Sequence, residues 1–163
     1  MSESSPEGLP AGVIDPARVP ARRTTSYPDP FKAAVAGREK RALGDAAGLR
    51  NFGVNLTRLE PGAASALRHW HERQDELVYV LEGEVTLVTD EYERVLGPGM
   101  AAGFPAGRAC GHQLVNRSRR PALYLEIGDR SPEDRVHYTQ DDLDARLDPA
   151  GRWRFTHKDG RPY

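Results

Sequence analysis

The sequence predicts an all-β protein, an antiparallel sandwich or barrel made of many short strands. Apolar residues alternate with polar ones from Asn51 onward, beginning with Phe52, Val54 and Leu56, and this is the period of a strand with one buried face. Clusters of turn-forming residues interrupt the alternation at regular intervals. The 163 residues include 16 Gly and 13 Pro, a combined share well above the usual value of roughly 12%. Residues of these two types break long helices and suit short strands joined by turns.

Seven further strands are predicted after the turn at residues 60–62. We expect the turn around residues 72–74 to bring the second of them back antiparallel beside the first, and Gly83 to sit in a hairpin turn where a positive φ is needed. Regular short strands of this kind are typical of antiparallel sandwiches and barrels. The predicted strands are 65–71, 75–82, 84–89, 92–96, 100–104, 111–116 and 121–128.

The segments on either side of residues 51–128 have a different character. Residues 1–50 form a predicted N-terminal arm and lead-in, proline-rich in its first thirty residues, with at most a weak helix at 33–47. Residues 129–163 form a predicted C-terminal tail that is charged, with a short helix at 140–147 and a basic, aromatic end. Arm and tail are expected to pack on the barrel or on a partner subunit, and the sequence leaves both open.

Composition excludes several classes of protein. The formal net charge is −1, which argues against nucleic acid or an anionic membrane as a partner. The basic residues at 152–161 are more typical of a solvated or docking segment. One Cys can form neither an intrachain disulfide nor a Cys-based zinc site. The longest apolar run, 77–81, is too short to span a bilayer, and the acidic start lacks a secretory signal. We therefore expect one soluble, cytoplasmic domain.

Two histidines carry the first indication of chemistry. His69 and His71 are two residues apart on a predicted strand, so their side chains share a face while Trp70 points the other way. Glu76, on the next strand, is expected to lie opposite the pair. Two imidazoles and a carboxylate suit a divalent transition metal. From the residues alone, a pair of surface or core histidines without a metal is an equally valid interpretation.

His112 is the candidate for a fourth ligand. It lies in the predicted strand 111–116, and it completes a set of three His and one Glu if that strand packs beside the first pair. Four protein ligands leave one or two positions open on a five- or six-coordinate metal, and Lewis-acid or oxygen chemistry requires such an opening.

Two sequence motifs resemble those of the cupin superfamily. The first is Pro61-Gly62-x6-His69-x-His71-x4-Glu76-x6-Gly83, and the second is Gly99-x5-Pro105-x-Gly107-x4-His112-x3-Asn116. The resemblance covers residues 61–116 and, with the strand pattern, about 51–128. It implies a double-stranded β-helix, the jelly-roll cupin barrel, with an extended N-terminal arm and a short helical or irregular C-terminal tail. It also implies that His69, His71, Glu76 and His112 bind the metal, which is Fe, Mn, Ni, Zn or Cu.

The motifs depart from the family pattern in two loops. Six residues rather than five separate Gly62 from His69, and four rather than two separate Gly107 from His112. Loops tolerate such insertions, but the second one changes the rim of the site and places Arg108 and Cys110 there. Cys110 is expected either near the metal or as a small apolar filler. Arg108 either meets an anionic substrate or is solvated.

The resemblance implies a metal-binding cupin that acts on a small polar molecule. The first expectation is an isomerase of a sugar or sugar phosphate. The alternatives are a metal-dependent dioxygenase, a decarboxylase of a small organic acid, a non-catalytic ligand-binding cupin, and a barrel that the metal merely staples together. The general acid or base is unknown: Tyr124, Glu126 and Arg108 are candidates without a stronger indication.

One face of the predicted strand at 75–82 raises the question of a partner. If Glu76 faces inward, Val78 and Val80 do so too, and the apolar residues between them face outward. An uncovered apolar strand face is an association site. We therefore expect a homodimer, with a two-layer sandwich covered by the chain itself as the alternative.

Overall fold

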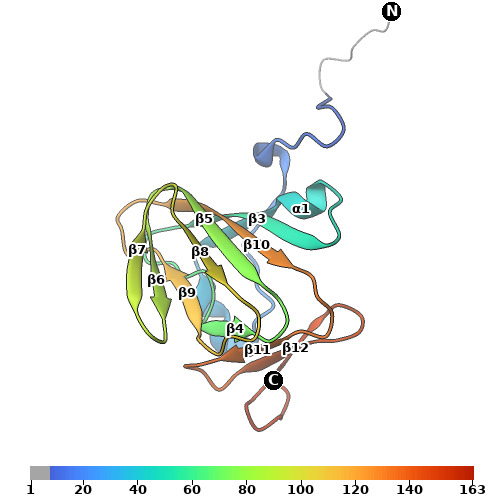
Figure 1. The fold of residues 1–163 in the computed structure, drawn as a ribbon, viewed down its shortest axis with the longest axis vertical. Helices are drawn as coiled ribbons and strands as arrows, with labels where there is room; N and C mark the ends of the chain where they lie inside the picture. The colour runs from blue at the N-terminus through green and yellow to red at the C-terminus, as the bar shows by residue number, and fades with distance from the viewer. Residues whose placement is uncertain (1–7) are drawn as a thin grey trace, which may run out of the picture.

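Two antiparallel sheets face each other in the computed structural model, which describes residues 8–163 (Figure 1). The first sheet has the order β1 (Ala21–Arg22), β2 (Arg38–Ala42), β3 (Phe52–Leu59), β10 (Ala122–Asp129), β5 (Glu76–Glu82) and β8 (Ala101–Phe104). The second has the order β13 (Trp153–Thr156), β12 (Asp144–Leu147), β11 (Arg135–Tyr138), β4 (His69–His71), β9 (His112–Val115), β6 (Val85–Thr89) and β7 (Glu93–Leu96).

The chain passes repeatedly from one sheet to the other between residues 52 and 129. It runs through β4 in the second sheet, β5 in the first, β6 and β7 in the second, β8 in the first, β9 in the second and β10 in the first. This alternation is the jelly-roll arrangement of a double-stranded β-helix. The predicted fold class is therefore confirmed, and all eight strands predicted from residue 51 to residue 128 are present.

Two local pairings differ from the sequence prediction. We expected β4 and β5 to be neighbours, but β4 pairs with β9 and β11, and Glu76 on β5 reaches the histidines from the opposite sheet. Gly83 has the predicted positive φ, 70°, yet it carries the chain between sheets rather than closing a hairpin. A Cβ at this position would lie 2.6 Å from the Pro121 carbonyl oxygen. Period-2 patterns give the face of each residue but not the sheet to which a strand belongs.

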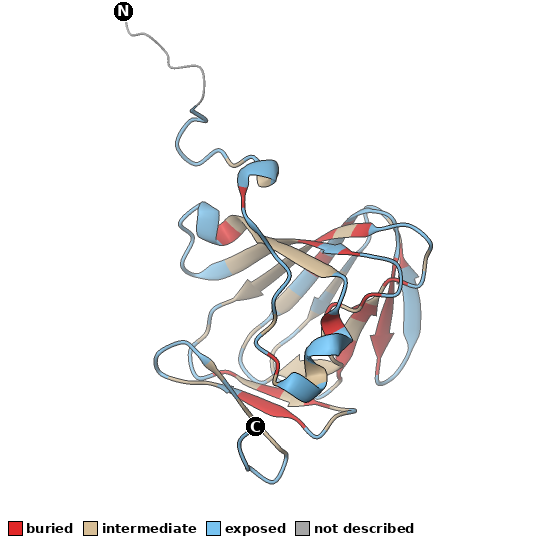
Figure 2. Ribbon diagram, turned by 180° about the vertical axis from the view of Figure 1, so that it is seen from behind, coloured by how far each residue is buried: buried red, intermediate tan, exposed pale blue. Residues whose placement is uncertain are grey.

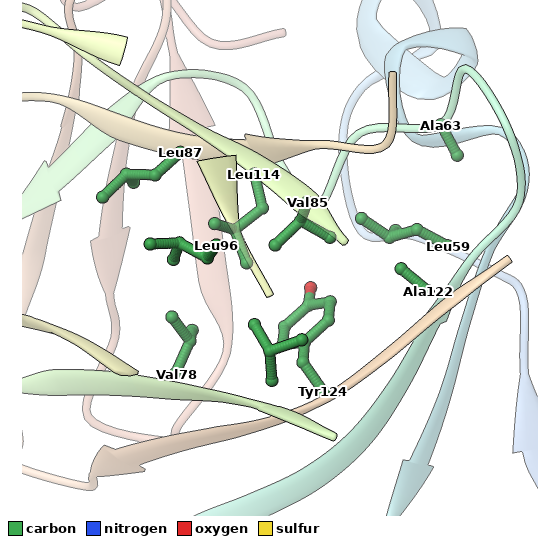
Figure 3. Close-up of a cluster of buried hydrophobic side chains, with 10 residues drawn as sticks. Leu59, Ala63, Val78, Val85, Leu87, Leu96, Leu114, Ala122 and Tyr124 are labelled. Carbon is green, nitrogen blue, oxygen red and sulfur yellow. The ribbon is translucent and has the colours of Figure 1, made fainter. Parts of the chain in front are cut away.

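One end of the barrel is filled with apolar side chains. Figure 3 shows that they point toward one another from both sheets. Tyr124 and Val80 from the first sheet are fully buried, as is Leu59, and Val85 and Leu114 from the second are 1% and 2% exposed. Each fully buried side chain of this kind stabilises the fold by roughly 1.5–3 kcal/mol. This cluster is the main core, and it fixes the distance between the sheets.

The N-terminal arm packs on its own barrel. Strand β1 pairs with β2 at the edge of the first sheet, and Tyr27 packs edge-on against Tyr138 and Phe155 of the second. The arm thus passes from one sheet to the other (Figure 2). Residues 1–7 of the predicted arm lie outside the described residues. Strands β1, β2 and β11–β13 lie outside residues 51–128 and extend the two sheets. The predicted boundaries of the barrel at 50/51 and 128/129 stay predictions.

The weak helix predicted at 33–47 is wrong. A 3-10 helix spans Asp29–Val35, strand β2 follows, and α1 covers Leu43–Ala46; a further 3-10 helix spans Pro16–Arg18. Gly37 has a φ of 81°, and this left-handed residue ends any continuous helix before β2. Pairing of β2 with β3 then satisfies the backbone of 38–42.

The short helix predicted at 140–147 is also wrong, since strand β12 occupies its second half. Leu143 and Ala145 are 0% and 1% exposed in a second apolar cluster with Tyr27, Val136 and Tyr138. Pairing with β11 and β13 supplies the backbone hydrogen bonds of β12. Packing and pairing therefore outweigh the helical propensity of Leu, Ala and Arg. Within residues 8–163, no helix has the length and apolar character needed to cross a bilayer.

Candidate metal centre

Three side chains converge at the end of the barrel opposite the apolar core. His69 and His71 point inward from β4, and Glu76 points inward from the start of β5 in the facing sheet. One ligand atom from each lies within 4.8 Å of the other two, so the group can hold a metal ion. The predicted convergence of these three residues is therefore present, by a route across the barrel rather than between adjacent strands.

Hydrogen bonds at the outer ring nitrogens determine what the histidines present to Glu76. The Nδ1 of His69 lies 2.7 Å from the Leu67 carbonyl oxygen, and the Nδ1 of His71 lies 2.5 Å from Asp134 Oδ2. Both partners accept hydrogen bonds, so each Nδ1 carries the proton. In the neutral rings each Nε2 then directs a lone pair toward Glu76 Oε2, 3.5 Å from His69 and 3.4 Å from His71. Lone pairs and an anionic oxygen at this range require a cation or a proton between them.

Asp134 is a functional residue that sequence analysis missed. Its side chain is fully buried, and besides His71 it accepts a hydrogen bond from the Arg73 backbone N–H at 2.8 Å. Glu133, with a φ of 58°, precedes it at the start of β11. A carboxylate behind a ligating imidazole fixes the ring and its tautomer, and raises its basicity. Asp134, Val136 and Tyr138 are all buried, and their spacing of two in the sequence was a signal that Asp134 shares the inward face of the two apolar residues.

His112 approaches the same carboxylate oxygen. It lies directly opposite His69 in the β4–β9 ladder, and its Nε2 is 2.8 Å from Glu76 Oε2. Its ring stacks on Phe104 with 3.6 Å between ring centroids. The strand pairing on which the predicted fourth ligand depended is present. Whether His112 binds the metal stays a prediction.

Charge and burial act against each other at this centre. Burial disfavours the imidazolium of His71, but the carboxylates of Asp134 and Glu76 outweigh burial and raise the pKa of His71 to about 10. Burial alone raises the pKa of Glu76, yet the imidazoles around it hold that pKa well below its usual value. Burial lowers the pKa of His112. Protons therefore compete with a metal for the same lone pairs.

Three cavities meet at His71 within residues 8–163. The first, about 280 Å³, lies among β6–β9 and contains Glu76 and His112. The second, about 610 Å³, lies between the arm and β11–β13 and contains His69. The third, about 540 Å³, contains Glu76 and Glu126. Volumes of roughly 300–1,000 Å³ are typical of sites for small molecules.

The structure distinguishes the three candidates for proton transfer. The Tyr124 hydroxyl is buried in the apolar core, where it has no hydrogen-bond partner among residues 8–163. Arg108 is exposed and pairs with Glu91 at 3.2 Å on the rim of the first cavity. Glu126 lines the cavity that also contains Glu76 and His71. Of the three, Glu126 alone combines a titratable carboxylate with this position.

The remaining singled-out residues lie around this centre rather than in it. Cys110 is a half-buried free thiol that lines the first cavity beside His112. Trp70 faces out of the barrel, where its ring stacks on His137 with 4.4 Å between centroids. His157 pairs with Asp142 at 2.8 Å. The arginines of the basic tail pair with acidic neighbours, as Arg154 does with Asp148 at 3.0 Å.

The fold and the convergent donors together define a class, the jelly-roll barrels with a candidate metal site at one end. Comparison with known proteins gives the family. A family model described as the Cupin domain matches residues 55–128. A crystal structure from Silicibacter pomeroyi, described as a sugar phosphate isomerase from a cupin superfamily, is 46% identical with a TM-score of 0.89. That match covers 93% of this chain and 96% of the other. The chain therefore belongs to the cupin superfamily.

Two further structures extend the comparison. One from Acidithiobacillus ferrooxidans, provisionally named a sugar phosphate isomerase, is 32% identical with a TM-score of 0.69, and the match covers 77% of this chain and 80% of that one. The polyketide cyclase RemF from Streptomyces resistomycificus is 23% identical with a TM-score of 0.63, covering 78% and 84%, which shows a shared fold alone. No curated protein sequence matches the chain.

Proposed function

We propose that this cupin is a metal-dependent isomerase of a phosphorylated sugar. The observation that carries the proposal is the convergence of the His69 and His71 imidazoles on the Glu76 carboxylate, next to three cavities that His71 lines. The two similar structures described as sugar phosphate isomerases support the choice of reaction. A cupin barrel hosts many chemistries, so the fold by itself does not select one.

The proposed ligands are His69, His71, Glu76 and His112. Three imidazoles and one carboxylate suit Fe, Mn, Ni, Zn or Cu, and the geometry of the site and the availability of each metal decide which one is bound. A divalent ion held by these residues would supply a Lewis acid for a carbonyl or hydroxyl oxygen of the sugar. Asp134 holds the His71 ring in the tautomer that this requires.

Glu126 is the proposed carrier of the proton. Interconversion of an aldose and a ketose moves one proton between adjacent carbons and a second proton between the oxygens on those carbons. A carboxylate at the cavity wall would take the carbon-bound proton from one carbon and return it to the other. Glu126 points inward from β10 and accepts a hydrogen bond from Lys40 Nζ at 2.6 Å. This contact holds its carboxylate in place.

The test is to incubate the purified, metal-loaded protein with aldose and ketose phosphates in deuterated water and follow the sugars by NMR. We expect isomer formation with deuterium at the exchanged carbon, and loss of both after chelation. The Glu126→Gln variant should bind the same amount of metal but neither isomerise the sugar nor exchange its proton. Fully loaded protein that leaves every sugar phosphate unchanged contradicts the proposal.

The same experiment separates the other cupin activities. Oxygen consumption with a small organic acid would identify a dioxygenase, and carbon dioxide release a decarboxylase. Saturable binding without turnover would identify a ligand-binding module. The His112→Ala variant addresses a metal that only staples the barrel: in an enzyme, turnover is lost with little change in melting temperature, whereas a staple loses stability instead.

We also propose that two copies associate through the outer face of the first sheet. Leu77, Tyr79 and Leu81 of β5 are 41%, 40% and 38% exposed. The register places Leu125 beside Tyr79 and Ile127 beside Leu77, so the apolar residues form a continuous face. The arm joins the far edge of this sheet and leaves the β5 residues exposed. A monomer seldom leaves a contiguous apolar face to water.

Light scattering after size exclusion tests the dimer. Wild type should have twice the mass of the chain, and Tyr79→Arg should shift it to the monomer. Val95→Arg is the matched control, since Val95 is an exposed apolar strand residue, 50% exposed, on the other sheet. A monomeric wild type contradicts the proposal.

A further inference from the structure

The cavity of about 610 Å³ has a wall that the metal centre does not explain. It is formed by the N-terminal arm and β2 on one side and by aromatic residues of β11 and β13 on the other. His69 and His71 line its inner end. A ligand in this cavity therefore reaches the candidate metal centre at one end and the arm at the other.

The polar wall of this cavity is cationic. Arg22, Arg38 and Lys40 line it, and no carboxylate does. Arg38 Nη1 donates to the Ser65 carbonyl oxygen at 2.5 Å, and Lys40 pairs with Glu126 at 2.6 Å from the neighbouring cavity. Glu126 balances the charge of Lys40, and the charges of Arg22 and Arg38 remain without a carboxylate partner. The hydroxyls of Thr24 and Ser26 line the same wall and add donors.

The strand register places two of these cations side by side. Arg22 of β1 lies directly opposite Lys40 of β2, so both side chains share one face of the sheet. Like charges directly opposite each other destabilise an antiparallel pair. Glu126 neutralises Lys40, but the Arg22 side chain has no ion pair or hydrogen bond within residues 8–163. The Arg22 guanidinium is therefore left to pair with an anion that binds in this cavity.

We propose that Arg22, Lys40 and Arg38 bind the phosphate group of the substrate, with Thr24 and Ser26 as further donors. The inference rests on the proposed function and names the part of the site that selects a phosphorylated sugar. A phosphate monoester carries up to two negative charges, which match the two uncompensated positive charges, and a guanidinium donates to two phosphate oxygens at once. The sugar then extends from the arm toward His69 and His71.

The neighbouring arginine provides a matched control. Arg23 is next in the sequence, and its side chain is 80% exposed and pairs with Glu39 at 2.9 Å outside the cavity. Arg22→Met and Arg23→Met remove the same charge from opposite faces of the arm, and Arg23→Met also removes the exposed ion pair with Glu39. Arg22 is exposed on a two-residue edge strand, so both variants should melt at the temperature of the wild type.

Calorimetric titration of the metal-loaded protein tests the phosphate site. The probes are glucitol 6-phosphate, which has no carbonyl group to isomerise, then glucitol, gluconate and inorganic phosphate. We expect the wild type to bind glucitol 6-phosphate more tightly than glucitol. Arg22→Met should lower the affinity for glucitol 6-phosphate on the order of tenfold to a hundredfold. Arg23→Met should bind it like the wild type, and inorganic phosphate should compete.

Three results overturn the proposal. The first is that glucitol 6-phosphate binds no more tightly than glucitol. The second is that Arg22→Met and Arg23→Met lower the affinity for glucitol 6-phosphate equally. The third is that gluconate binding depends on Arg22 to the same extent, which would identify a carboxylate site. Arg22-dependent phosphate binding without any isomerisation contradicts the proposed function and leaves this site standing. Isomerisation with an unchanged KM in Arg22→Met contradicts this site and leaves the function standing.

Discussion

The two ends of the barrel use the same strands for opposite purposes. At one end the inward side chains of β5 are Val78 and Val80, which belong to one buried apolar cluster with Leu114 and Val85 from the other sheet. At the other end the inward residue of β5 is Glu76, which meets histidines beside three cavities. Moving two residues along one strand therefore changes the interior from apolar packing to polar donors.

The difference shows how a small barrel holds a group of buried polar residues that is costly on its own. The buried carboxylates and imidazoles at the histidine end are costly without a bound cation. The filled end stabilises the fold independently of them, because its side chains make no hydrogen bond to the centre. Variants at the filled end should therefore change stability, and variants at the histidine end should change metal binding. Each prediction below tests this separation.

The largest expected effect is on metal binding in His71→Ala. This variant removes a donor, leaves Asp134 without its imidazole partner and leaves Glu76 with two of its three imidazoles, so we expect no stoichiometric metal by elemental analysis. His137→Ala is the control, since this His stacks on Trp70 outside the barrel and should keep full metal content. Normal metal content in His71→Ala would place the metal elsewhere.

Leu59→Ala should have the next largest effect, and on stability alone. Leu59 is fully buried in the filled end, and deleting it should lower the free energy of unfolding by about 2–5 kcal/mol in urea titrations. Leu49→Ala, at a position 38% exposed, should cost far less. The metal content per folded molecule should not change. A parallel loss of metal would show that the two ends are not independent.

Asp134→Asn should have a smaller effect, confined to the metal. The amide keeps the size of the side chain and an acceptor for His71 but loses the charge, so we expect metal affinity to fall roughly 10–100-fold in chelator competition. Asp144→Asn is the control, because Asp144 pairs with Arg135 on the neighbouring strand. Equal losses in both variants would reduce the role of Asp134 to general electrostatics.

Cys110→Ser should have the smallest effect. The thiol lines the first cavity, but no hydrogen bond joins it to His112 or Glu76. We expect metal content, melting temperature and turnover within error of the wild type. A marked loss of turnover would give this thiol a role in the site and bring the first cavity into the reaction.

Much of the barrel was predictable from the sequence because each strand carries its own period. The His69 and His71 side chains share a face, as alternation requires, and Val78 and Val80 are buried as predicted. The sheet to which β4 and β5 belong was not predictable, because that choice depends on contacts between residues far apart in the chain. The same holds for β12, which pairing with β11 and β13 converts from a helix-prone segment into a strand.

The site shows the same limit. The convergence of His69, His71 and Glu76 followed from spacing and family resemblance. Asp134 and Arg22 lie in segments that are predicted as charged turns or a proline-rich arm. Only the pairing of β11 with β4 and of β1 with β2 brings Asp134 behind His71 and Arg22 to the wall of the large cavity. For Asp134, the available signal in the sequence was its spacing of two from Val136 and Tyr138, which predicts a shared inward face. No comparable local pattern marks Arg22.

The crossing of the arm from the first sheet to the second has a consequence for recognition of homologous sequences. The Cupin domain match spans residues 55–128. The cationic wall of the large cavity comes from residues 22–40, and its aromatic wall from residues 136–155. Two proteins can therefore match this family equally well over the barrel and still present different chemistry to a ligand. Sorting such proteins by the residues at positions 22, 38 and 40 would group them by the ligand they bind rather than by ancestry.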